Sequence, residues 1–317
     1  MPTPRIAVLI PCLDEAQTIE KVVNDFQVQL PEALIYVFDN ASTDATVEVA
    51  QAAGAIVRLI PDKGKGRVVR QMFREVDADI YILVDGDDTY PAEAIKEMLE
   101  PVKNGQADMV VGDRLSGTYD KQNKRRFHSF GNRLVRWLIN RLYSAQLQDI
   151  LSGYRVFNRL FVKNFPVQSS GFEIETEMSL HALDKRFKIV SIPISYKNRP
   201  TGSESKLKTY SDGVRVLRTI ISIFKNYRPM PFFGTLAFAL FLLGLFSGIW
   251  PIIDYLEHQF VYRVPLAILA TGLILSGLIS LAIGIILNTV SHFHRIHYDH
   301  QINLYLESRQ GKKAPRN

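Results

Sequence analysis

The sequence contains a single cysteine, Cys12, among its 317 residues. One thiol cannot form an internal disulfide, and it excludes a zinc site built from a cluster of cysteines. A thiol nucleophile needs an activating base, and no histidine lies near Cys12 in the sequence. The cysteine usage therefore favours a protein of a reducing compartment without a cysteine-based site.

Two long stretches near the C-terminal end lack charged residues altogether. Residues 232–253 carry no charge over 22 positions, and residues 264–287 carry none over 24. Each exceeds the length of about 20 apolar residues that a helix needs to cross a hydrocarbon core of about 30 Å. We therefore predict a hairpin of two transmembrane helices over residues 231–290. A pair of buried core helices in a large soluble protein is the alternative.

The loop between these stretches is poor in basic residues, whereas both outer flanks are rich in them. Residues 254–263 hold one lysine or arginine. The basic residues that flank the hairpin are Arg215, Arg218, Lys225, Arg228, Arg295, Arg309, Lys312, Lys313 and Arg316. Positive flanks stay in the cytoplasm. We therefore expect an integral membrane protein whose soluble domain and both termini are cytosolic.

Nothing at the start of the chain looks like a signal peptide, because residues 1–5 lead directly into a buried strand pattern. The formal net charge of +6 is explained by membrane topology and by attraction to anionic lipid headgroups. We therefore expect the lipid bilayer, and not nucleic acid, as a partner of the chain.

The first 115 residues alternate between short apolar runs and amphipathic stretches. The apolar runs predict strands at residues 6–10, 34–38, 55–60, 80–84 and 109–111. The stretches between them predict helices at residues 16–30, 43–53, 66–76 and 91–102. Alternating β and α units of this spacing indicate an α/β fold with a mainly parallel, doubly wound sheet. Ligands bind beyond the carboxyl ends of the strands in such sheets, and polar segments follow the predicted strands here.

Charge and hydropathy divide the chain into four predicted parts. These are an α/β domain at residues 1–210, a juxtamembrane amphipathic helix at 211–230, the transmembrane hairpin at 231–290 and a basic cytosolic tail at 291–317. Within the first part, residues 116–128 are polar and predict a loop. A basic amphipathic helix with Trp137 follows this loop. It either covers the sheet or lies on the membrane surface.

Asp85 and Asp87 follow the strand that is predicted at residues 80–84. Two carboxylates at positions i and i+2 both leave the sheet edge where the chain turns. There they can hold Mg²⁺ or Mn²⁺, which prefer oxygen ligands and often bridge to substrate phosphates. Turns are rich in Asp, so the pair indicates a metal site mainly through its place after the fourth strand.

Asp39 ends the second predicted strand in the same way. Its carboxylate could accept hydrogen bonds from a ribose or a base, or the segment could simply cap the next helix through Ser42 and Thr43. Residues 63–67, which include Lys65, combine glycine with positive charge at a helix start and suit a phosphate group. They are not a Walker loop, because the Gly-x-x-x-x-Gly-Lys-Ser/Thr spacing is absent.

Several short motifs occur in a fixed order along the chain: IPCLDE at 10–15, DNASTD at 39–44, GKG at 64–66, DGD at 85–87, VGDR at 111–114, SGYR at 152–155, GFEIE at 171–175, Arg199 and SKL at 205–207. Together they resemble glycosyltransferase family 2 with the GT-A fold, and in particular the polyprenyl-phosphate sugar synthases. This group includes dolichyl-phosphate mannose synthases and bacterial undecaprenyl-phosphate glycosyltransferases. The resemblance covers about residues 5–210.

The resemblance implies a nucleotide-sugar donor, a polyprenyl phosphate acceptor and a divalent metal, Mg²⁺ or Mn²⁺. Asp85 and Asp87 would anchor the metal on the donor diphosphate. The residues expected at the donor are, with Lys65, Pro11, Asp14, Glu15, Asp39, Asn40, Arg199 and Lys206. Those expected at the acceptor phosphate are Arg114, Arg125 and Ser129; arginine suits phosphate because its donors form a planar fork. The expected catalytic residues are Asp87, Arg114 and Arg125.

The sequence departs from the family pattern at some of these positions. Asn40 stands where a second Asp is common, Asp14 where Asn is common, and Thr89 where some relatives have a Gln that assists the metal. The departures concern the identity of the donor. A UDP-sugar is favoured, and GDP-mannose is the alternative.

No histidine or isolated carboxylate is clearly placed in the sequence as a general base. The expected acceptor explains this absence, because a phosphate monoester with a second pKa of about 6 is largely dianionic at pH 7. It can attack the anomeric carbon directly. Catalysis then consists of positioning and of stabilising the departing diphosphate, and the predicted transfer inverts the anomeric configuration.

Two other functions share parts of this pattern. A processive polysaccharide synthase would carry Gln-x-x-Arg-Trp after a Thr-Glu-Asp motif. Residues 133–137 resemble the former, but they precede residues 175–177 and lack the Gln. A non-catalytic membrane adaptor built on a decayed transferase domain is the second alternative. The intact metal and phosphate ligands in the sequence disfavour it.

The sequence does not decide the roles of three glutamates and of three small residues. Glu173, Glu175 and Glu177 either begin a helix with favourable dipole placement or order the acceptor segment or the sugar. Small residues at positions 272, 276 and 277 could allow close helix packing. Because two-span relatives assemble into tetramers, we expect a homo-oligomer.

Overall fold

The computed structural model describes the chain except for residues 1–2, 115–125, 172, 198–224, 226–227 and 314–317. The chain divides into two compact units, Met1–Val214 and Arg215–Asn317. Residues 211–224, 226 and 227 of the predicted juxtamembrane helix at 211–230 lie outside the described residues.

A seven-stranded sheet forms the centre of the first unit, with strand order β3-β2-β1-β4-β6-β5-β7. The strands are β1 (Ile6–Cys12), β2 (Leu34–Asp39), β3 (Ile56–Leu59), β4 (Ile80–Leu83), β5 (Met109–Asp113), β6 (Arg155–Asn158) and β7 (Ile189–Pro193). β6 is antiparallel to both of its neighbours, and all other pairs are parallel. The prediction of a mainly parallel α/β sheet is confirmed.

The five strands predicted from apolar runs are β1 to β5. β6 and β7 were not predicted because their sequences, RVFN and IVSIP, lack a continuous apolar run. β6 begins with an arginine, and β7 is interrupted by Ser191. Only the neighbours in the sheet make these two segments strands, and local sequence does not contain that information.

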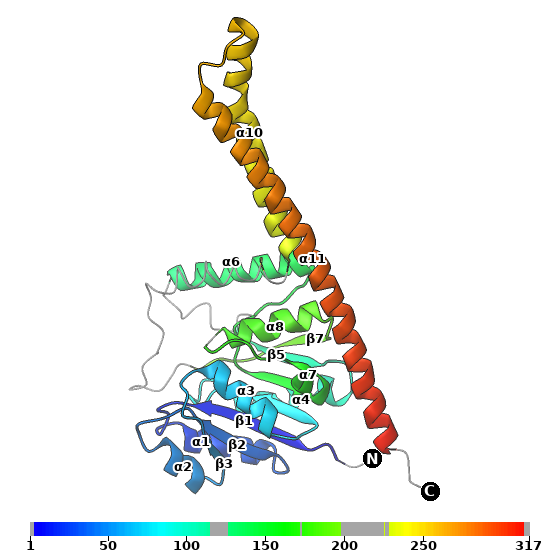
Figure 1. The fold of residues 1–317 in the computed structure, drawn as a ribbon. Coiled ribbons are helices and arrows are strands. Elements are labelled where there is room, and N and C mark those ends of the chain that lie inside the picture. The colour runs from blue at the N-terminus through cyan, green and yellow to red at the C-terminus, as the bar shows by residue number, and fades with distance from the viewer. Residues whose placement is uncertain (1–2, 115–125, 172, 198–224, 226–227, 314–317) are drawn as a thin grey trace. The chain divides into compact units, whose positions relative to one another are not determined.

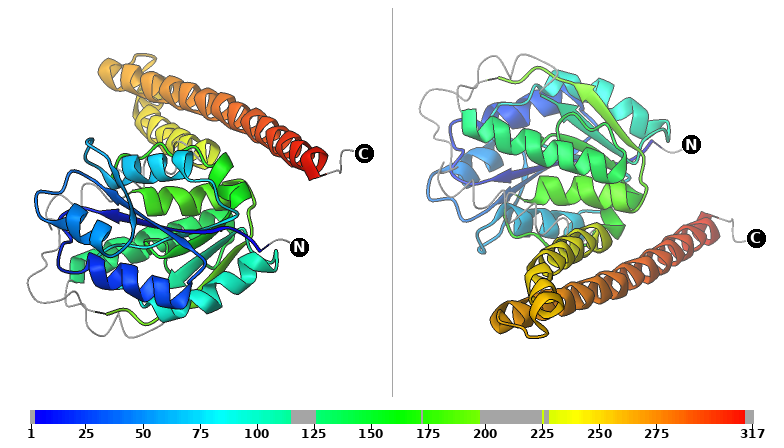
Figure 2. Two further views of the ribbon diagram at one scale, coloured as in Figure 1. Left: turned by 90° about the horizontal axis from the view of Figure 1, so that it is seen from below. Right: turned by 90° about the horizontal axis from the view of Figure 1, so that it is seen from above.

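Helices cover both faces of the sheet (Figure 1, Figure 2). α1 (Ile19–Gln29), α2 (Thr46–Ala52), a 3-10 turn (Ala92–Ala94) and α4 (Ile95–Lys103) share one core with the strands. α3 (Lys65–Glu75), α7 (Arg159–Asn164) and α8 (Ile174–Asp184) lie on the other face, and α6 (Arg126–Tyr143) contacts α8. The predicted helices at 16–30, 43–53, 66–76 and 91–102 correspond to α1 to α4.

Each face of the sheet buries its own aromatic contacts. On one face the ring of Phe26 in α1 meets Tyr154 edge to face, with centroids 6.1 Å apart. On the other face Phe157 of β6 stacks on Phe161 of α7 at 5.0 Å and packs against Phe73 of α3 at 5.7 Å. Such pairs add about 0.5–1.5 kcal/mol beyond the area they bury. The helices of the second face are therefore held to the sheet largely by phenylalanine.

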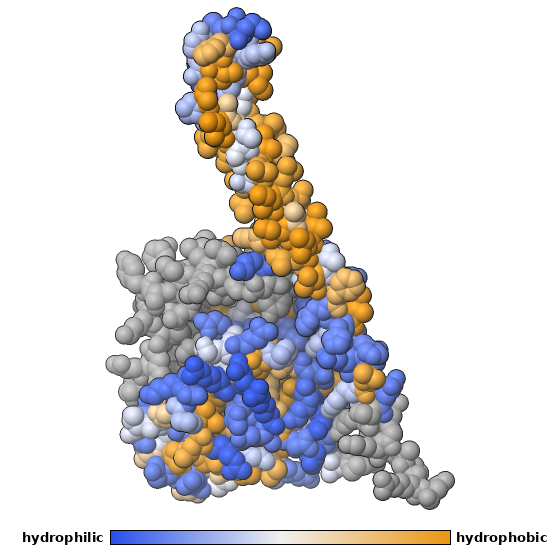
Figure 3. All heavy atoms as spheres, viewed as in Figure 1, coloured by the Kyte–Doolittle hydropathy of each residue, from blue (hydrophilic) through white to orange (hydrophobic). Residues whose placement is uncertain are grey.

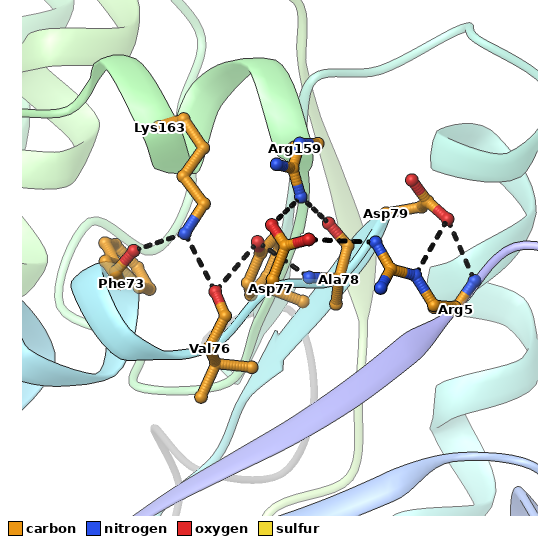
Figure 4. Close-up of polar contacts among 9 residues, drawn as sticks. Arg5, Phe73, Val76, Asp77, Ala78, Asp79, Arg159 and Lys163 are labelled. Carbon is orange, nitrogen blue, oxygen red and sulfur yellow. Dashed lines mark hydrogen bonds and ion pairs between the residues drawn. The ribbon is translucent and has the colours of Figure 1, made fainter.

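A network of charged side chains fixes the amino ends of β1 and β4 (Figure 4). Arg5 donates to the carboxylate of Asp77 at 2.9 Å and its backbone amide donates to Asp79 at 3.1 Å. Arg159 also contacts Asp77, and Lys163 donates to two carbonyl oxygens at the end of α3, at 2.8 Å each. These ion pairs lie at the amino edge of the sheet, opposite the predicted ligand edge, and so have a structural role.

The second unit contains two long helices, α10 (Pro229–His258) and α11 (Val264–Lys313). Both are long and apolar enough to cross a membrane, with mean hydropathies of 2.2 and 2.4 over their most apolar windows. Only 17% of each window is buried, which disfavours the alternative of buried core helices. Figure 3 shows an apolar surface along α10 and the first part of α11, with hydrophilic residues at the tip of the hairpin and toward the end of α11.

Glycines bring α10 and α11 into close contact. A Cβ at Gly244 would lie 2.7 Å from a side-chain carbon of Ile274, and one at Gly284 would lie 2.9 Å from Phe233. Gly277 faces the Ala237 carbonyl in the same way, whereas nothing lies within 4 Å of a Cβ at Gly272. Of the small residues predicted to allow close helix packing, Gly277 does so within the hairpin.

Arg155, the first residue of β6, is a fully buried side chain with 0% exposure. Its guanidinium donates to the carbonyl oxygens of Ile150 at 2.7 Å and Ser152 at 2.9 Å, and to the hydroxyl of Ser179 in α8 at 3.0 Å. Burial lowers the pKa of Arg155 to about 10, because the interior disfavours the charged form. The planar fork of this side chain holds the segment before β6 to α8.

Replacing Arg155 by lysine should destabilise the domain. A single ammonium cannot satisfy three acceptors spread around a planar guanidinium, and each buried acceptor left unpaired costs about 1–3 kcal/mol. In thermal unfolding of the purified protein in detergent, Arg155→Lys should lower Tm by several degrees, at about 2–4 °C per kcal/mol for a domain of this size. Arg74→Lys, on the exposed side of α3, is the matched control. Equal Tm values for the two variants would contradict this role.

Candidate active site

The loops after β1 and β2 are hydrogen-bonded to each other at the carboxyl edge of the sheet. The Asp14 amide donates to the Ser42 hydroxyl at 2.8 Å, and the Asp14 carboxylate accepts from the Thr43 amide at 2.6 Å. The Glu15 amide donates to the Thr46 hydroxyl at 2.9 Å. Asp14 has a positive φ of 52°, a conformation that Asp tolerates better than most residues. Asp14 and Glu15 thus lie at the predicted edge, where they join two loops.

Asp39 presents a buried carboxylate oxygen at this edge. The residue ends β2 beside Cys12 of β1, one position beyond the pair formed by Pro11 and Phe38. Its Oδ2 accepts a hydrogen bond from the Ser42 amide at 3.1 Å. Its Oδ1 is buried and has no hydrogen-bond partner among the described residues. An unpaired buried oxygen is costly, so Oδ1 is available to accept a hydrogen bond from a hydroxyl or N–H group.

The side chain of Asn40 holds the loop that precedes α3. Its amide nitrogen donates to the carbonyl oxygens of Ile60 at 3.2 Å and Asp62 at 2.8 Å, and its oxygen accepts from the Gly64 amide at 2.6 Å. These contacts use the amide on both sides. Asn40 therefore positions the glycine-rich segment in the described structure, and a direct contact with a ligand stays a prediction.

Gly86 fixes the turn that carries Asp85 and Asp87. A Cβ at Gly86 would lie 2.7 Å from the Cys12 sulfur, so the position has no room for a side chain. The Thr18 hydroxyl donates to the Gly86 carbonyl at 2.7 Å. Burial, followed by the nearby carboxylates, raises the pKa of the Cys12 thiol well above its ordinary value. Cys12 is therefore a neutral packing group behind the turn.

Lys65 is paired with two carboxylates. Its Nζ lies 2.5 Å from Asp85 Oδ1 and 2.7 Å from Glu175 Oε1. Burial lowers the pKa of Lys65, but Asp85 and Glu175 outweigh this effect and raise the pKa above its ordinary value. The ammonium therefore stays charged. It joins the start of α3, the turn after β4 and the first turn of α8.

The backbone of the 167–170 segment packs directly against the glycines on either side of Lys65. A Cβ at Gly64 would lie 2.2 Å from the Ser170 carbonyl oxygen, and one at Gly66 would lie 2.1 Å from that of Ser169. The Glu177 carboxylate accepts from the amides of Gln168 and Ser169 at 2.8 Å each. Glu177 thus fixes the segment against which the first residues of α3 pack.

Asp87 is buried, and its Oδ1 accepts a hydrogen bond from the Thr89 hydroxyl at 2.6 Å. Among the described residues, no group of three or more His, Cys, Asp or Glu side chains is placed to hold a metal ion. Mg²⁺ is commonly held by only one or two carboxylates, with substrate phosphates and water completing its shell. Asp85 and Asp87 therefore fit a divalent cation that is shared with a diphosphate, and they do not form a closed protein cage.

Arg114 forms a bidentate ion pair with the buried carboxylate of Asp149, with distances of 2.7 and 3.1 Å. Its guanidinium also lies over the ring of Tyr196, 5.4 Å from the centroid. Burial lowers the pKa of Arg114, but Tyr90 and Asp149 raise it further, so that it ends well above its ordinary value. The residue is a permanent, oriented cation at the end of β5.

Comparison with known proteins identifies the family. The family model described as "Glycosyl transferase family 2" matches residues 7–165. Glycosyltransferase AglJ of Haloferax volcanii is 32% identical over 297 residues, which cover 93% of this chain and 97% of that protein. The chain belongs to glycosyltransferase family 2. A dolichol-phosphate mannosyltransferase of Pyrococcus furiosus is 28% identical over 217 residues, or 64% of this glycosyltransferase and 59% of that relative.

The fold of the glycosyltransferase is GT-A-like. A crystal structure of glucosyl-3-phosphoglycerate synthase from Mycobacterium tuberculosis, in complex with Mn²⁺, UDP-glucose and phosphoglyceric acid, superposes with a TM-score of 0.55. The two chains are 22% identical, and the match covers 70% of this chain and 79% of the other. The predicted fold class and the prediction of a glycosyltransferase are confirmed.

Four predicted site residues of the glycosyltransferase cannot be placed. Arg125, Arg199 and Lys206 lie outside the described residues, and so does the side chain of Ser129 in the first turns of α6. Their roles stay predictions. The residues that are described at the carboxyl edge come from the loops after β1, β2 and β4, from the end of β5 and from the first residues of α3 and α8.

Sequence reasoning missed three residues that organise the site. Glu175 and Glu177 belong to the set of three glutamates whose role the sequence leaves open, and their partners, Lys65 and the amides of residues 168 and 169, could not be identified from it. Asp149, the partner of Arg114, gave no signal at all. The sequence shows that Lys65 stands between two glycines and that Glu175 stands two positions before Glu177. Neither pattern indicates that Lys65 and Glu175 form an ion pair.

The close contact at Gly66 should make this position intolerant of any side chain. Gly66→Ala places a Cβ against a backbone oxygen that Glu177 holds in place. Overpacking of this kind costs about 1–3 kcal/mol and occasionally more. Gly105→Ala is the comparison, since a Cβ there meets nothing within 4 Å and suffers only its φ of 68°, at about 1–2 kcal/mol. In thermal unfolding, Gly66→Ala should lower Tm more than Gly105→Ala; the reverse order would refute the contact.

Proposed function

We propose that this glycosyltransferase transfers a sugar from a nucleotide-sugar, preferably a UDP-sugar, to the phosphate of a polyprenyl phosphate. One observation carries the proposal. The unpartnered oxygen of Asp39 and the Asp85–Gly86–Asp87 turn lie at one edge of the sheet, in a chain that also has two helices able to cross a membrane. The relative named a dolichol-phosphate mannosyltransferase supports this class of acceptor.

The donor would lie across the carboxyl ends of β2, β1 and β4. Asp39 Oδ1 would accept a hydrogen bond from the nucleoside, which removes the cost of leaving that oxygen unpaired. The diphosphate would face the start of α3, where the helix N-terminus and Lys65 favour an anion. Asp85 and Asp87 would hold Mg²⁺ or Mn²⁺, which supplies positive charge to the leaving diphosphate.

The acceptor phosphate can act as its own nucleophile. It is largely dianionic at pH 7, so attack on the anomeric carbon needs no base and inverts the configuration. His181 does not supply such a base, because its ring packs against Phe161, Phe165 and Phe187. Arg114 would orient the phosphate, together with Arg125 and Ser129 as predicted from the family pattern.

The membrane lies, in this proposal, next to the acceptor site on the cytosolic side. The basic flanks of the hairpin support that orientation. On α6, Arg133, Trp137 and Arg141 recur at i, i+4 and i+8 and are exposed, with Trp137 at 61%. A tryptophan between arginines suits an anionic lipid interface. The homo-oligomer stays a prediction.

Replacing Asp87 should remove sugar transfer while leaving the protein in the membrane. The loss of one of two metal-binding carboxylates should reduce kcat/KM by about a thousandfold or more, since metal stabilisation is worth several kcal/mol. Transfer to undecaprenyl or dolichyl phosphate would be measured for Asp87→Ala with a panel of nucleotide sugars and Mn²⁺ or Mg²⁺. Asp25→Ala, on α1, is the control. Near-normal turnover of Asp87→Ala with metal present would sink the mechanism.

Replacing Arg125 should weaken use of the lipid acceptor more than binding of the donor. A hydrogen bond to a charged group contributes about 1.5–3 kcal/mol, so Arg125→Ala should raise KM for the polyprenyl phosphate about tenfold or more. Affinity for the nucleotide should change little. Arg126→Ala is the matched control, because the assignment of Arg125 depends on its spacing to Ser129. Equal losses for donor and acceptor would undo the assignment.

A further inference from the structure

The carboxylate that we expect to bind a divalent cation already has a cation beside it. Lys65 Nζ lies 2.5 Å from Asp85 Oδ1 and 2.7 Å from Glu175 Oε1. The side chains of Lys65 and Glu175 are only 11% and 6% exposed. Water therefore screens this contact weakly, and a buried charge of this kind needs a partner.

The surroundings of Asp85 limit how a second cation can approach. Oδ1 is in contact with the Lys65 ammonium. On the other side, a Cβ at Gly153 would lie 2.6 Å from Oδ2, so the backbone of residue 153 stands directly against that oxygen. A metal that binds at Asp85 must then share or replace the ammonium contact, and two cations on one carboxylate that is only 26% exposed repel each other.

We propose that Lys65 and the divalent cation exchange at Asp85. The ammonium neutralises this carboxylate in the empty site, and it turns to the donor diphosphate when the metal and the nucleotide bind together. Lys65 is the first residue of α3, so its flexible four-carbon stem starts at the helix end that suits phosphate. The inference deepens the proposed function and rests on it.

Glu175 is the positioning residue of this exchange. It keeps its contact with the ammonium, so that Lys65 is not left without a carboxylate when the metal takes Asp85. Glu175 can do so because the first turn of α8 is fixed: two residues on, Glu177 is bonded to the amides of Gln168 and Ser169. The Lys65 ammonium therefore moves from Asp85 to the donor diphosphate while it stays in contact with Glu175, and it does not move into solvent.

The exchange has a thermodynamic consequence. Metal alone must displace the ammonium without offering it a new partner, whereas metal with a nucleoside diphosphate supplies one. Each ligand should therefore tighten the binding of the other, and linkage requires the two effects to be equal. A site without exchange would still show attraction between metal and diphosphate, but that part does not depend on Lys65.

The decisive experiment compares the wild type with the double variant Lys65→Met/Glu175→Gln. Both carry one net negative charge over positions 65, 85 and 175, but only the wild type has an ammonium at Asp85. Binding of Mn²⁺ to the full chain in detergent would be measured by electron paramagnetic resonance, with and without UDP. We expect the double variant to bind Mn²⁺ alone about tenfold more tightly, and the coupling between Mn²⁺ and UDP to fall by a similar factor.

The single variants provide a test of sign. Lys65→Met should strengthen the binding of Mn²⁺ alone, and Glu175→Gln should weaken it, because the ammonium then has only Asp85 as a partner. A merely structural role would move both in the same direction. Lys96→Met, an exposed lysine on α4, is the charge-matched control and should match the wild type. Melting temperatures of all variants would show which of them fold. Lys65→Met leaves two carboxylates without their cation, whereas the double variant leaves only Asp85, whose side chain is 26% exposed.

The results separate this inference from the proposed function. If Asp85→Asn abolishes the binding of Mn²⁺ with UDP but the double variant behaves like the wild type, the exchange is refuted and the metal site stands. If Asp85→Asn leaves the binding of Mn²⁺ with UDP unchanged, both the metal site and the exchange are refuted. Tighter binding of Mn²⁺ alone in the double variant, with reduced coupling, supports the exchange.

Discussion

The burial of one ammonium group between two carboxylates determines how three segments of the enzyme meet. Lys65 comes from the start of α3, Asp85 from the turn after β4 and Glu175 from α8. Since a buried charge is tolerated only when it is paired, none of the three can shift alone. The glycines beside Lys65 allow the close backbone approach that this contact requires. This part of the carboxyl edge is thus preorganised by the same residues that give it its charge.

The fold could be predicted from the sequence wherever burial leaves a local pattern. β1 to β5 are continuous apolar runs and α1 to α4 are amphipathic, so their order alone indicates a parallel sheet. The hairpin follows from the absence of charge over two long stretches. β6 and β7 could not be predicted in this way. The former begins with the buried Arg155, whose partners Ile150, Ser152 and Ser179 satisfy it only in the folded chain.

The site was predictable to the extent that topology alone places residues together. Asp39, Asp85 and Asp87 were located because each follows a strand, and the carboxyl ends of parallel strands meet at one edge. Pairings across the chain were not predictable. Asn40 was expected at the donor, yet its amide holds the loop before α3. The partners of Lys65 and Arg114 depend on how α8 and the segment before β6 return to the edge, which no spacing in the sequence encodes.

The reversed direction of β6 has a consequence for the segment between β5 and β6. Because β5 ends and β6 begins at the same edge of the sheet, this excursion leaves and re-enters the domain at one place. The ion pair between Arg114 and Asp149 closes it at its base. The described part of this segment is packed onto the domain, because α6 contacts α8 and the carbonyl oxygens of Ile150 and Ser152 accept hydrogen bonds from Arg155. The β5–β6 segment and the turn after β4 are therefore mechanically coupled, because Gly153 near the end of this segment lies directly against the carboxylate of Asp85.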